Sequence, residues 1–512
     1  MSFKTFTMLI RAARRALLTW SVPWRCQALA GVVLTFFFHI ATAAPALEPC
    51  RIKGVPREVR CGGVQVAENP DKPLGRQISV RFALVPALAK RAAPDPIFIF
   101  AGGPGQSAIA IAPQVLATQA LLNARRDLVF VDQRGTGDSN RLGCTPPDPD
   151  TTLVESTDSA AHFKRLENCI QQVMAQGHDT RQYATWIAMR DVDAVRAALG
   201  VEHINLWAAS YGTRAALEYL RQFPAHVRSV VLDGVVPPDA VLPLSFARDN
   251  DAALERVIQQ CAQTPACNAR YPDLSARLSA LLAKADAGQL QYTITHPVTG
   301  AKERVSLDRG ALMSSLRTPL YMPALAAVLP EALSKAAKGD ANALIALSQT
   351  LSSAVGEGLA EVMHFAVICA EDFPRMKTAA TDQLTRFSNT LEDVYRHICP
   401  RVPVREVPQA FFAPPQTNVP VLLLSGGADP ATPPRLGEAL HRQLKNSLHL
   451  IAPNLSHGVA HQGCAPELIH RFIRQASLEQ QASFEGISDA CLKALPAPTF
   501  YVAPAPRHES AQ

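Results

Sequence analysis

Between residues 77 and 235, short apolar runs alternate with stretches of helical periodicity. The runs are rich in β-branched and aromatic residues, a pattern typical of strands that are buried on both faces of a sheet. Strands that alternate with helices in this way predict a mostly parallel sheet with crossover helices. The clearest predicted strands are residues 97–100, 128–131, 204–207 and 230–232, preceded by antiparallel edge strands at 63–67 and 78–85.

The pattern changes after the two prolines at residues 237–238. From residue 240 to 395 the chain is rich in Ala and Leu and follows a helical period, with almost no strand signal. Strand-like runs return at residues 419–424 and 448–451. A sheet that is interrupted by helices and then resumes predicts one α/β core with an inserted helical cap.

These changes divide the chain into five predicted parts. They are a signal peptide at 1–43, a first core segment at 44–240, a helical cap at 241–395, a second core segment at 396–495 and a tail at 496–512. The tail is rich in Pro and Ala, and we expect it to be loosely ordered.

The first residues have the pattern of an export signal. A basic stretch that ends at Arg25 precedes an apolar run at residues 28–40, and Ala-Thr-Ala at residues 41–43 fits a cleavage site. The apolar run is short for a membrane span, so we expect the signal peptide to be cleaved and the mature protein to have no stable membrane insertion. We expect the mature protein to be periplasmic or secreted. The alternative is an uncleaved N-terminal anchor.

Charge and cysteine content agree with export. Five of the 50 basic residues precede residue 44 and no acidic residue does, so the rest of the chain is close to neutral and offers no electrostatic basis for binding nucleic acid. Ten of the 11 cysteines follow the signal peptide, and an even number in an exported chain predicts disulfides. One possible connectivity pairs neighbours: Cys50 with Cys61, Cys144 with Cys169, Cys261 with Cys267, Cys369 with Cys399, and Cys464 with Cys491.

Ser210 is the candidate nucleophile. It lies in Ala-Ala-Ser-Tyr-Gly at residues 208–212, directly after a predicted strand and before a predicted helix at residues 213–222. A sharp strand–turn–helix connection with small neighbours is the setting that exposes a catalytic serine. The alternative for Ser210 alone is an ordinary helix-capping residue.

A glycine-rich loop at residues 101–107 follows the predicted strand 97–100. Backbone N–H groups in such a loop can stabilise a developing oxyanion, and we expect the amides of Gly103 and Tyr211 to do so. The alternative is a dinucleotide site, with Asp132 as the ribose ligand. Pro104 lacks an N–H that a pyrophosphate would need, so we expect no organic cofactor.

Asp429 and His457 complete the candidate site. Asp429 follows a predicted buried strand, and His457 follows the last one. The order serine, acid, histidine is that of hydrolases with a parallel sheet, in which the acid orients the imidazole and the imidazole takes the serine proton. Asp233, which also ends a strand, is the alternative acid, and His461 is the alternative base.

A metal site is the competing interpretation of the same region. His457, His461 and Cys464 have helix-like spacing, but a closed structural zinc site needs a fourth ligand that is not evident. We therefore expect no metal.

These motifs resemble the proline iminopeptidase family (peptidase family S33), and most closely its tripeptidyl aminopeptidase-like branch. The resemblance rests on residues 102–105, 132–137 and 210–213 together with Asp429 and His457. It implies an α/β-hydrolase fold and a serine peptidase that removes residues from peptide N-termini through an acyl-enzyme, without metal or organic cofactor. The chain departs from the family pattern at Ala101, where many members have histidine, and at Ala208, where the turn usually has glycine.

An aminopeptidase must bind a free α-ammonium group, and buried carboxylates can do this. Glu371 and Asp372, near the end of the predicted cap, are our candidates, and Glu361 is a weaker one. The alternative is that they form a solvated acidic turn.

Two other functions are alternatives for a chain with this fold. An esterase acting on small-molecule or acyl-chain esters needs the same triad and oxyanion donors. A binding protein on this fold would have lost the catalytic groups, whereas Ser210, Asp429 and His457 are all present.

Overall fold

The computed structural model describes residues 47–145, 151–154, 158–296, 298–356, 359–376, 385–387, 390–476 and 484–504. The predicted signal peptide and the last residues of the predicted tail lie outside these ranges. In the described part of the chain, no helix is both long and apolar enough to cross a membrane.

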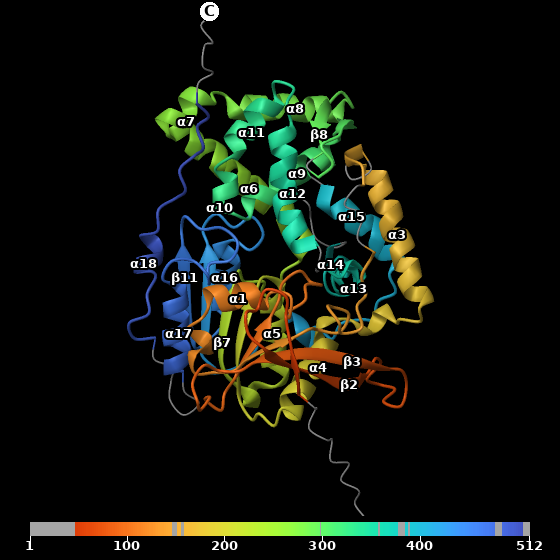
Figure 1. Ribbon diagram of the computed structural model, residues 1–512, viewed down its shortest axis with the longest axis vertical. Coiled ribbons are helices and arrows are strands. Elements are labelled where there is room, and N and C mark those ends of the chain that lie inside the picture. The colour runs from red at the N-terminus through yellow and green to blue at the C-terminus, as the bar shows by residue number, and fades with distance from the viewer. Residues whose placement is uncertain are drawn as a thin grey trace, which may run out of the picture. The chain divides into compact units, whose positions relative to one another are not determined.

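A nine-stranded sheet forms the centre of the fold (Figure 1), in the order β1-β2-β3-β5-β4-β6-β7-β10-β11. The first three strands run antiparallel, and β3 pairs antiparallel with β5, but all later pairs are parallel. The mostly parallel sheet with antiparallel edge strands is thereby confirmed. The strands are β1 (Glu48–Cys50), β2 (Val59–Ala67), β3 (Gln77–Val85), β4 (Ile97–Phe100), β5 (Leu128–Val131), β6 (Ile204–Ala209), β7 (Val227–Asp233), β10 (Val421–Gly426) and β11 (Ser447–Ala452).

Helices cover both faces of the sheet, which explains its near-continuous apolar strands. All four residues of β4 are buried, and Phe98 and Phe100 pack into one core whereas Ile97 and Ile99 pack into another. Successive side chains of a strand point to opposite faces, so both faces need a cover. The covering helices are α1 (Ala112–Thr118), α3 (Ser159–Ala175), α4 (Thr185–Ala198), α5 (Tyr211–Gln222), α16 (Pro434–His441), α17 (Ala465–Gln475) and the short α18 (Ala490–Lys493).

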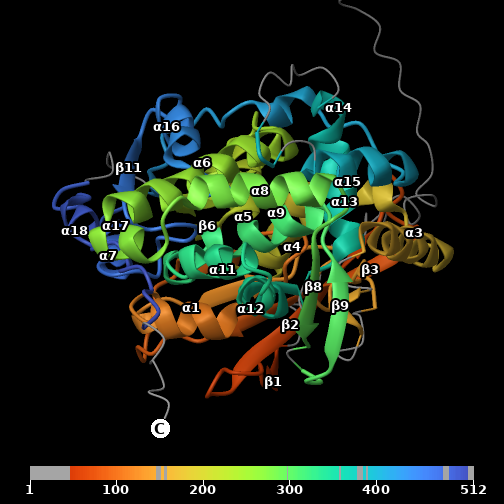
Figure 2. The same cartoon turned by 90° about the horizontal axis from the view of Figure 1, so that it is seen from above.

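A helical block follows β7 and has an apolar core of its own. Figure 1 shows these helices gathered at one end of the sheet, and Figure 2 looks onto them. The block contains one hairpin, β8 (Gln291–Thr295) with β9 (Lys302–Ser306), although we expected helices alone. Its helices are α6 (Leu242–Gln263), α7 (Pro265–Arg270), α8 (Leu274–Asp286), α9 (Arg309–Leu320), α10 (Pro323–Ala326), α11 (Leu329–Ala336) and α12 (Asn342–Gly356).

The last helices of the predicted cap pack differently from the rest. They are α13 (Glu361–Glu371), α14 (Phe373–Met376) and α15 (Thr390–Ile398). Their apolar residues join the core that covers the sheet, together with α4 and α5, rather than the core of the helical block. Phe387, between α14 and α15, instead joins the core of the helical block, so this part of the chain packs against both cores.

The described part of the tail contacts the helical block. Phe500 packs against the core of the block, the N–H of Tyr501 donates to the Ala327 carbonyl (3.1 Å), and the N–H of Ala503 donates to the Tyr271 hydroxyl (2.8 Å).

Five disulfides join the cysteines that are neighbours in the sequence, so the sequential pairing is confirmed. Because Cys464 is bonded to Cys491, no thiolate is available there, and the metal interpretation of His457, His461 and Cys464 is wrong. Among the described residues, no group of three or more His, Cys, Asp or Glu side chains is arranged to hold a metal ion.

Candidate active site

Ser210 occupies a tight turn between β6 and α5. Its backbone has φ 56° and ψ −131°, a conformation that residues other than glycine rarely adopt. The neighbouring backbone is very close, because a Cβ on Gly212 would lie 2.6 Å from the carbonyl oxygens of both Phe100 and Ala101. Ala208, which replaces the usual glycine, is fully buried in the sheet. The small residues of this motif are therefore explained by the space around the turn.

His457 and Asp429 are in direct contact. Nδ1 of His457 lies 2.9 Å from Oδ2 of Asp429, whose side chain is fully buried. Burial alone would raise the pKa of Asp429, but the charge and hydrogen bond of His457 and two bonds from Thr432 lower it below the usual range. Burial opposes protonation of His457, yet the Asp429 carboxylate raises its pKa overall. This acid therefore stays ionised and favours a charged imidazole, as a catalytic acid–base pair requires.

Asp233, the alternative acid, has other partners. Its Oδ1 accepts a hydrogen bond from the N–H of Val459, and its Oδ2 accepts one from the N–H of Ala460, both at 2.9 Å. Its backbone carbonyl accepts from the N–H of Ser210 (2.8 Å). Asp233 thus connects the serine turn to the backbone that follows His457, a link that sequence order could not reveal.

Thr432 is a residue of this site that the sequence analysis missed. Its Oγ1 donates to Oδ2 of Asp429 (2.7 Å) and lies 3.2 Å from Nδ1 of His457. The N–H groups of Ala431 and Thr432 both donate to Oδ1 of Asp429 at 2.8 Å. An aspartate followed three residues later by threonine is a local hydrogen-bonding pattern that could have identified it.

Replacing Thr432 by valine removes the hydroxyl and keeps the size of the side chain. We expect kcat to fall about 10- to 100-fold, since a hydrogen bond to a charged group contributes roughly this much. Thr432→Ser keeps the hydroxyl and should retain most of the activity. Steady-state kinetics of the two variants check the prediction, and equal activity of both would contradict it.

The glycine-rich loop passes beside the serine turn. A Cβ on Gly102 would lie 3.1 Å from Cβ of Ser210. Helix α5 begins at Tyr211, so the N–H of Tyr211 belongs to the first turn, whose donors have no acceptor within the helix. Asp132, the ribose ligand of the dinucleotide alternative, instead accepts from Oγ of Ser107 (2.7 Å) and the N–H of Ile109 (3.0 Å) and holds the end of this loop.

Glu371 and Asp372 are buried and are not a solvated turn. Asp372 forms two hydrogen bonds with Arg214 of α5, at 2.9 and 3.2 Å, and Oε2 of Glu371 lies 3.7 Å from the same guanidinium. All three side chains are at most 1% exposed. Burial raises the pKa of Glu371 to about 7. A substrate ammonium group would have to displace Arg214 to reach them, so the geometry does not favour the anchoring role that we expected.

Glu361, the weaker candidate, accepts a hydrogen bond from the N–H of Cys144 (3.0 Å). It therefore connects the start of α13 to the loop at Cys144, which carries one of the disulfides.

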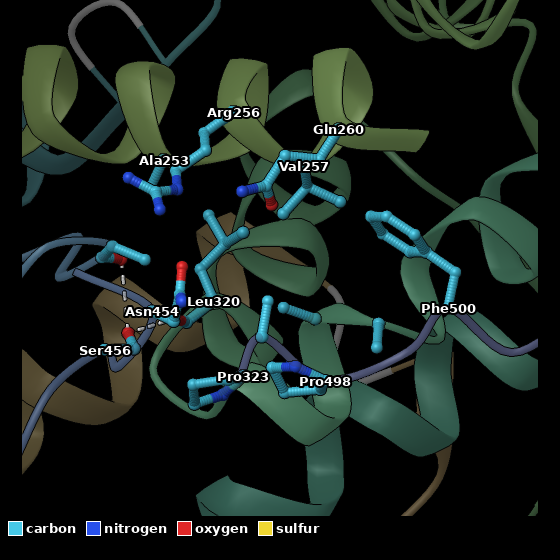
Figure 3. Close-up of a pocket in the computed structure, with 14 residues that line it drawn as sticks. Ala253, Arg256, Val257, Gln260, Leu320, Pro323, Asn454, Ser456, Pro498 and Phe500 are labelled. Carbon is cyan, nitrogen blue, oxygen red and sulfur yellow. Dashed lines mark hydrogen bonds between the residues drawn. The ribbon is translucent and has the colours of Figure 1, made fainter. Parts of the chain in front are cut away.

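The helical block contacts the loops that carry Asp429 and His457. Arg256 of α6 donates to the carbonyls of Gly427 and Pro453, at 3.3 and 2.9 Å. Ser456 donates to the Leu320 carbonyl (2.6 Å) at the end of α9, and Tyr321 meets the ring of His457 edge-on at 5.2 Å. Figure 3 shows the pocket that opens here, lined by α6, the α9–α10 connection, the histidine loop and the tail.

A serine on a strained turn after a central parallel strand, with an acid and a histidine at the ends of later strands, is the arrangement typical of α/β hydrolases. The chain belongs to the α/β hydrolase fold family, whose model matches residues 95–463. The predicted fold class and the resemblance stated above are thereby confirmed.

Curated relatives include the serine protease Hip1 of Mycobacterium tuberculosis (strain ATCC 25618 / H37Rv), which is 27% identical over 83% of this chain and 88% of that protein. The tripeptidyl aminopeptidase of Streptomyces lividans is 27% identical over 79% of each chain. Among solved structures, a proline iminopeptidase from Mycobacterium smegmatis is 17% identical with a TM-score of 0.39, over 81% of this chain and 99% of that one.

Proposed function

We propose that this protein is an exported serine peptidase that releases residues from peptide N-termini through an acyl-enzyme on Ser210. The observation that carries the proposal is the contact between His457 and Asp429. Both residues follow the carboxyl ends of parallel strands, at the same edge of the sheet as the strained turn of Ser210. The names of the relatives, a serine protease and a tripeptidyl aminopeptidase, support a peptide rather than another acyl substrate.

In this reaction the Ser210 oxygen attacks the carbonyl carbon of the scissile peptide bond and His457 takes the serine proton. The amides of Gly103 and Tyr211 would stabilise the oxyanion that forms. When the C–N bond breaks, His457 gives the proton to the leaving amine, and the N-terminal fragment remains as an ester on Ser210. Water, deprotonated by His457, then hydrolyses this ester and restores the free serine.

Export is supported by the five disulfides, which persist in oxidising compartments. We propose that residues 1–43 direct this export and are then removed. N-terminal sequencing of the mature protein tests the cleavage site, and a protein that retains residues 1–43 after export would contradict it.

A panel of four substrates tests the peptidase activity. We expect the protein to cleave aminoacyl- or tripeptidyl-arylamides and to lose at least about 100-fold in kcat/KM when the tripeptide is N-blocked, because selectivity for peptide N-termini requires recognition of the free ammonium group and blocking removes its charge. The fourth substrate is a short-chain ester. Turnover of the ester alone would show an esterase, and undiminished cleavage of the N-blocked peptide would exclude an aminopeptidase.

A further inference from the structure

The N-terminal end of α13 lies against the loop that contains Gly103. The N–H of Ala360 donates to the Gly105 carbonyl (2.9 Å), and Leu359 forms an antiparallel bridge with Gln106. The approach is so close that a Cβ on Gly105 would lie 2.8 Å from the Ala360 carbonyl oxygen. These contacts between the two backbone segments restrict the path of the glycine-rich loop.

His364 adds a side-chain contact to the same loop. Its Nδ1 lies 3.1 Å from the Pro104 carbonyl oxygen, and its Nε2 lies 3.1 Å from the hydroxyl of Tyr395. A carbonyl only accepts, so Nδ1 must carry the hydrogen and Nε2 must accept from Tyr395. Burial lowers the pKa of His364 and so favours the neutral ring that this arrangement needs.

The other end of α13 is linked to the Tyr211 side chain through Thr185. Oε1 of Glu371 accepts from the N–H of Thr185 (2.7 Å), whose hydroxyl lies 2.5 Å from the hydroxyl of Tyr211. Asp372, directly after the helix, holds Arg214 of α5. One helix therefore contacts the Gly103 loop directly and is linked to Tyr211 and α5 through Thr185 and Arg214.

We propose that α13 sets the distance between the Gly103 and Tyr211 amides, and that His364 is the positioning residue for the Gly103 loop. The inference rests on the proposed function, since these two amides matter only if Ser210 forms a tetrahedral intermediate. His364 acts through the Pro104 carbonyl and not on the substrate. Donors that are fixed before the reaction stabilise the transition state without a cost of reorganisation, and a displacement of about 1 Å can reduce the rate about 100-fold.

A disulfide reinforces this arrangement. Cys369 of α13 is bonded to Cys399, directly after α15, and α15 carries Tyr395. The helix that presents His364 and the helix that presents its hydroxyl partner are thus covalently joined. The ring of His364 is held between two fixed points, the Pro104 carbonyl and the Tyr395 hydroxyl.

The matched variants His364→Asn and His364→Leu test the proposal, because the two side chains have similar shapes and only asparagine keeps an N–H donor near the position of Nδ1. We expect His364→Leu to lose about 10- to 100-fold in kcat on the tripeptidyl-arylamide, with KM changed less than about threefold. His364→Asn should stay within about fivefold of the native kcat. Thermal unfolding of both variants shows whether they are equally folded.

Three results would overturn the inference while leaving the proposed function intact: native kcat in His364→Leu, equal losses in both variants, or a loss confined to KM.

If His364→Leu does not fold, Tyr395→Phe tests the inference instead, because it removes the hydroxyl that orients the His364 ring. We expect kcat of Tyr395→Phe to fall about three- to tenfold with KM unchanged, and native kcat would overturn the inference. A native protein that cleaves none of the four substrates would instead overturn the proposed function and the inference together.

Discussion

Replacing Ser210 by alanine is expected to lower kcat about 10⁶-fold, since removal of the nucleophile leaves only binding and oxyanion stabilisation. The fold should survive, because the Ser210 side chain is only half-buried and alanine differs from serine only in lacking the hydroxyl. Initial rates on the tripeptidyl-arylamide, together with thermal unfolding, measure both effects.

Ser279→Ala provides the control for this variant. Ser279 is exposed on α8 in the helical block, and its hydroxyl donates to the Ser275 carbonyl of the same helix. Activity of Ser279→Ala should equal that of the native protein. Residual activity of Ser210→Ala above about 1% of native would show that another group attacks the substrate.

The second large effect is expected for Asp429→Asn, which should lower kcat about 10⁴-fold at neutral pH by disturbing the tautomer of His457. The effect also has a pH signature. The Asp429 carboxylate raises the pKa of His457, so kcat/KM of the native protein should fall as the pH drops through that raised pKa. Without the carboxylate the pKa of His457 is lower, and the acidic limb of the residual activity should move to lower pH.

Asp233→Asn is the matched comparison for Asp429→Asn. It disturbs one of the two hydrogen bonds to the N–H groups of Val459 and Ala460 but leaves the bond between His457 and Asp429 in place. We expect a lower thermal stability and a loss of kcat well below that of Asp429→Asn. A 10⁴-fold loss in Asp233→Asn with an active Asp429→Asn would assign the acid to Asp233 instead.

The central strands could be predicted because a strand that is buried on both faces of a sheet has a short, nearly continuous run of apolar residues. The hairpin β8–β9 was missed although β8 alternates exposed residues with the buried Tyr292 and Ile294, as a half-buried strand does, because the segment around it is dominated by helical periodicity. The packing of α13 was also hidden. Its residues are apolar almost all round, so the pattern does not distinguish the core of the helical block from that of the sheet.

The candidate site was predictable where chain order and strand ends decide the positions, as for Ser210, Asp429 and His457. It was not predictable where residues far apart in the sequence form pairs. The contact of Asp372 with Arg214 joins residues 158 positions apart, and that of His364 with Pro104 joins residues 260 apart. From the sequence, Glu371 and Asp372 looked like free carboxylates because their cationic partner lies on another element.

Labelling with a fluorophosphonate, followed by mass spectrometry of the digested protein, tests the central claim most directly. The reagent forms a stable adduct only with an activated serine. We predict a single adduct on the peptide that contains Ser210, formed in parallel with the loss of arylamide cleavage and absent from Ser210→Ala. Active protein that carries no adduct, or an adduct on a different residue that abolishes activity, would contradict the assignment of Ser210 as the nucleophile.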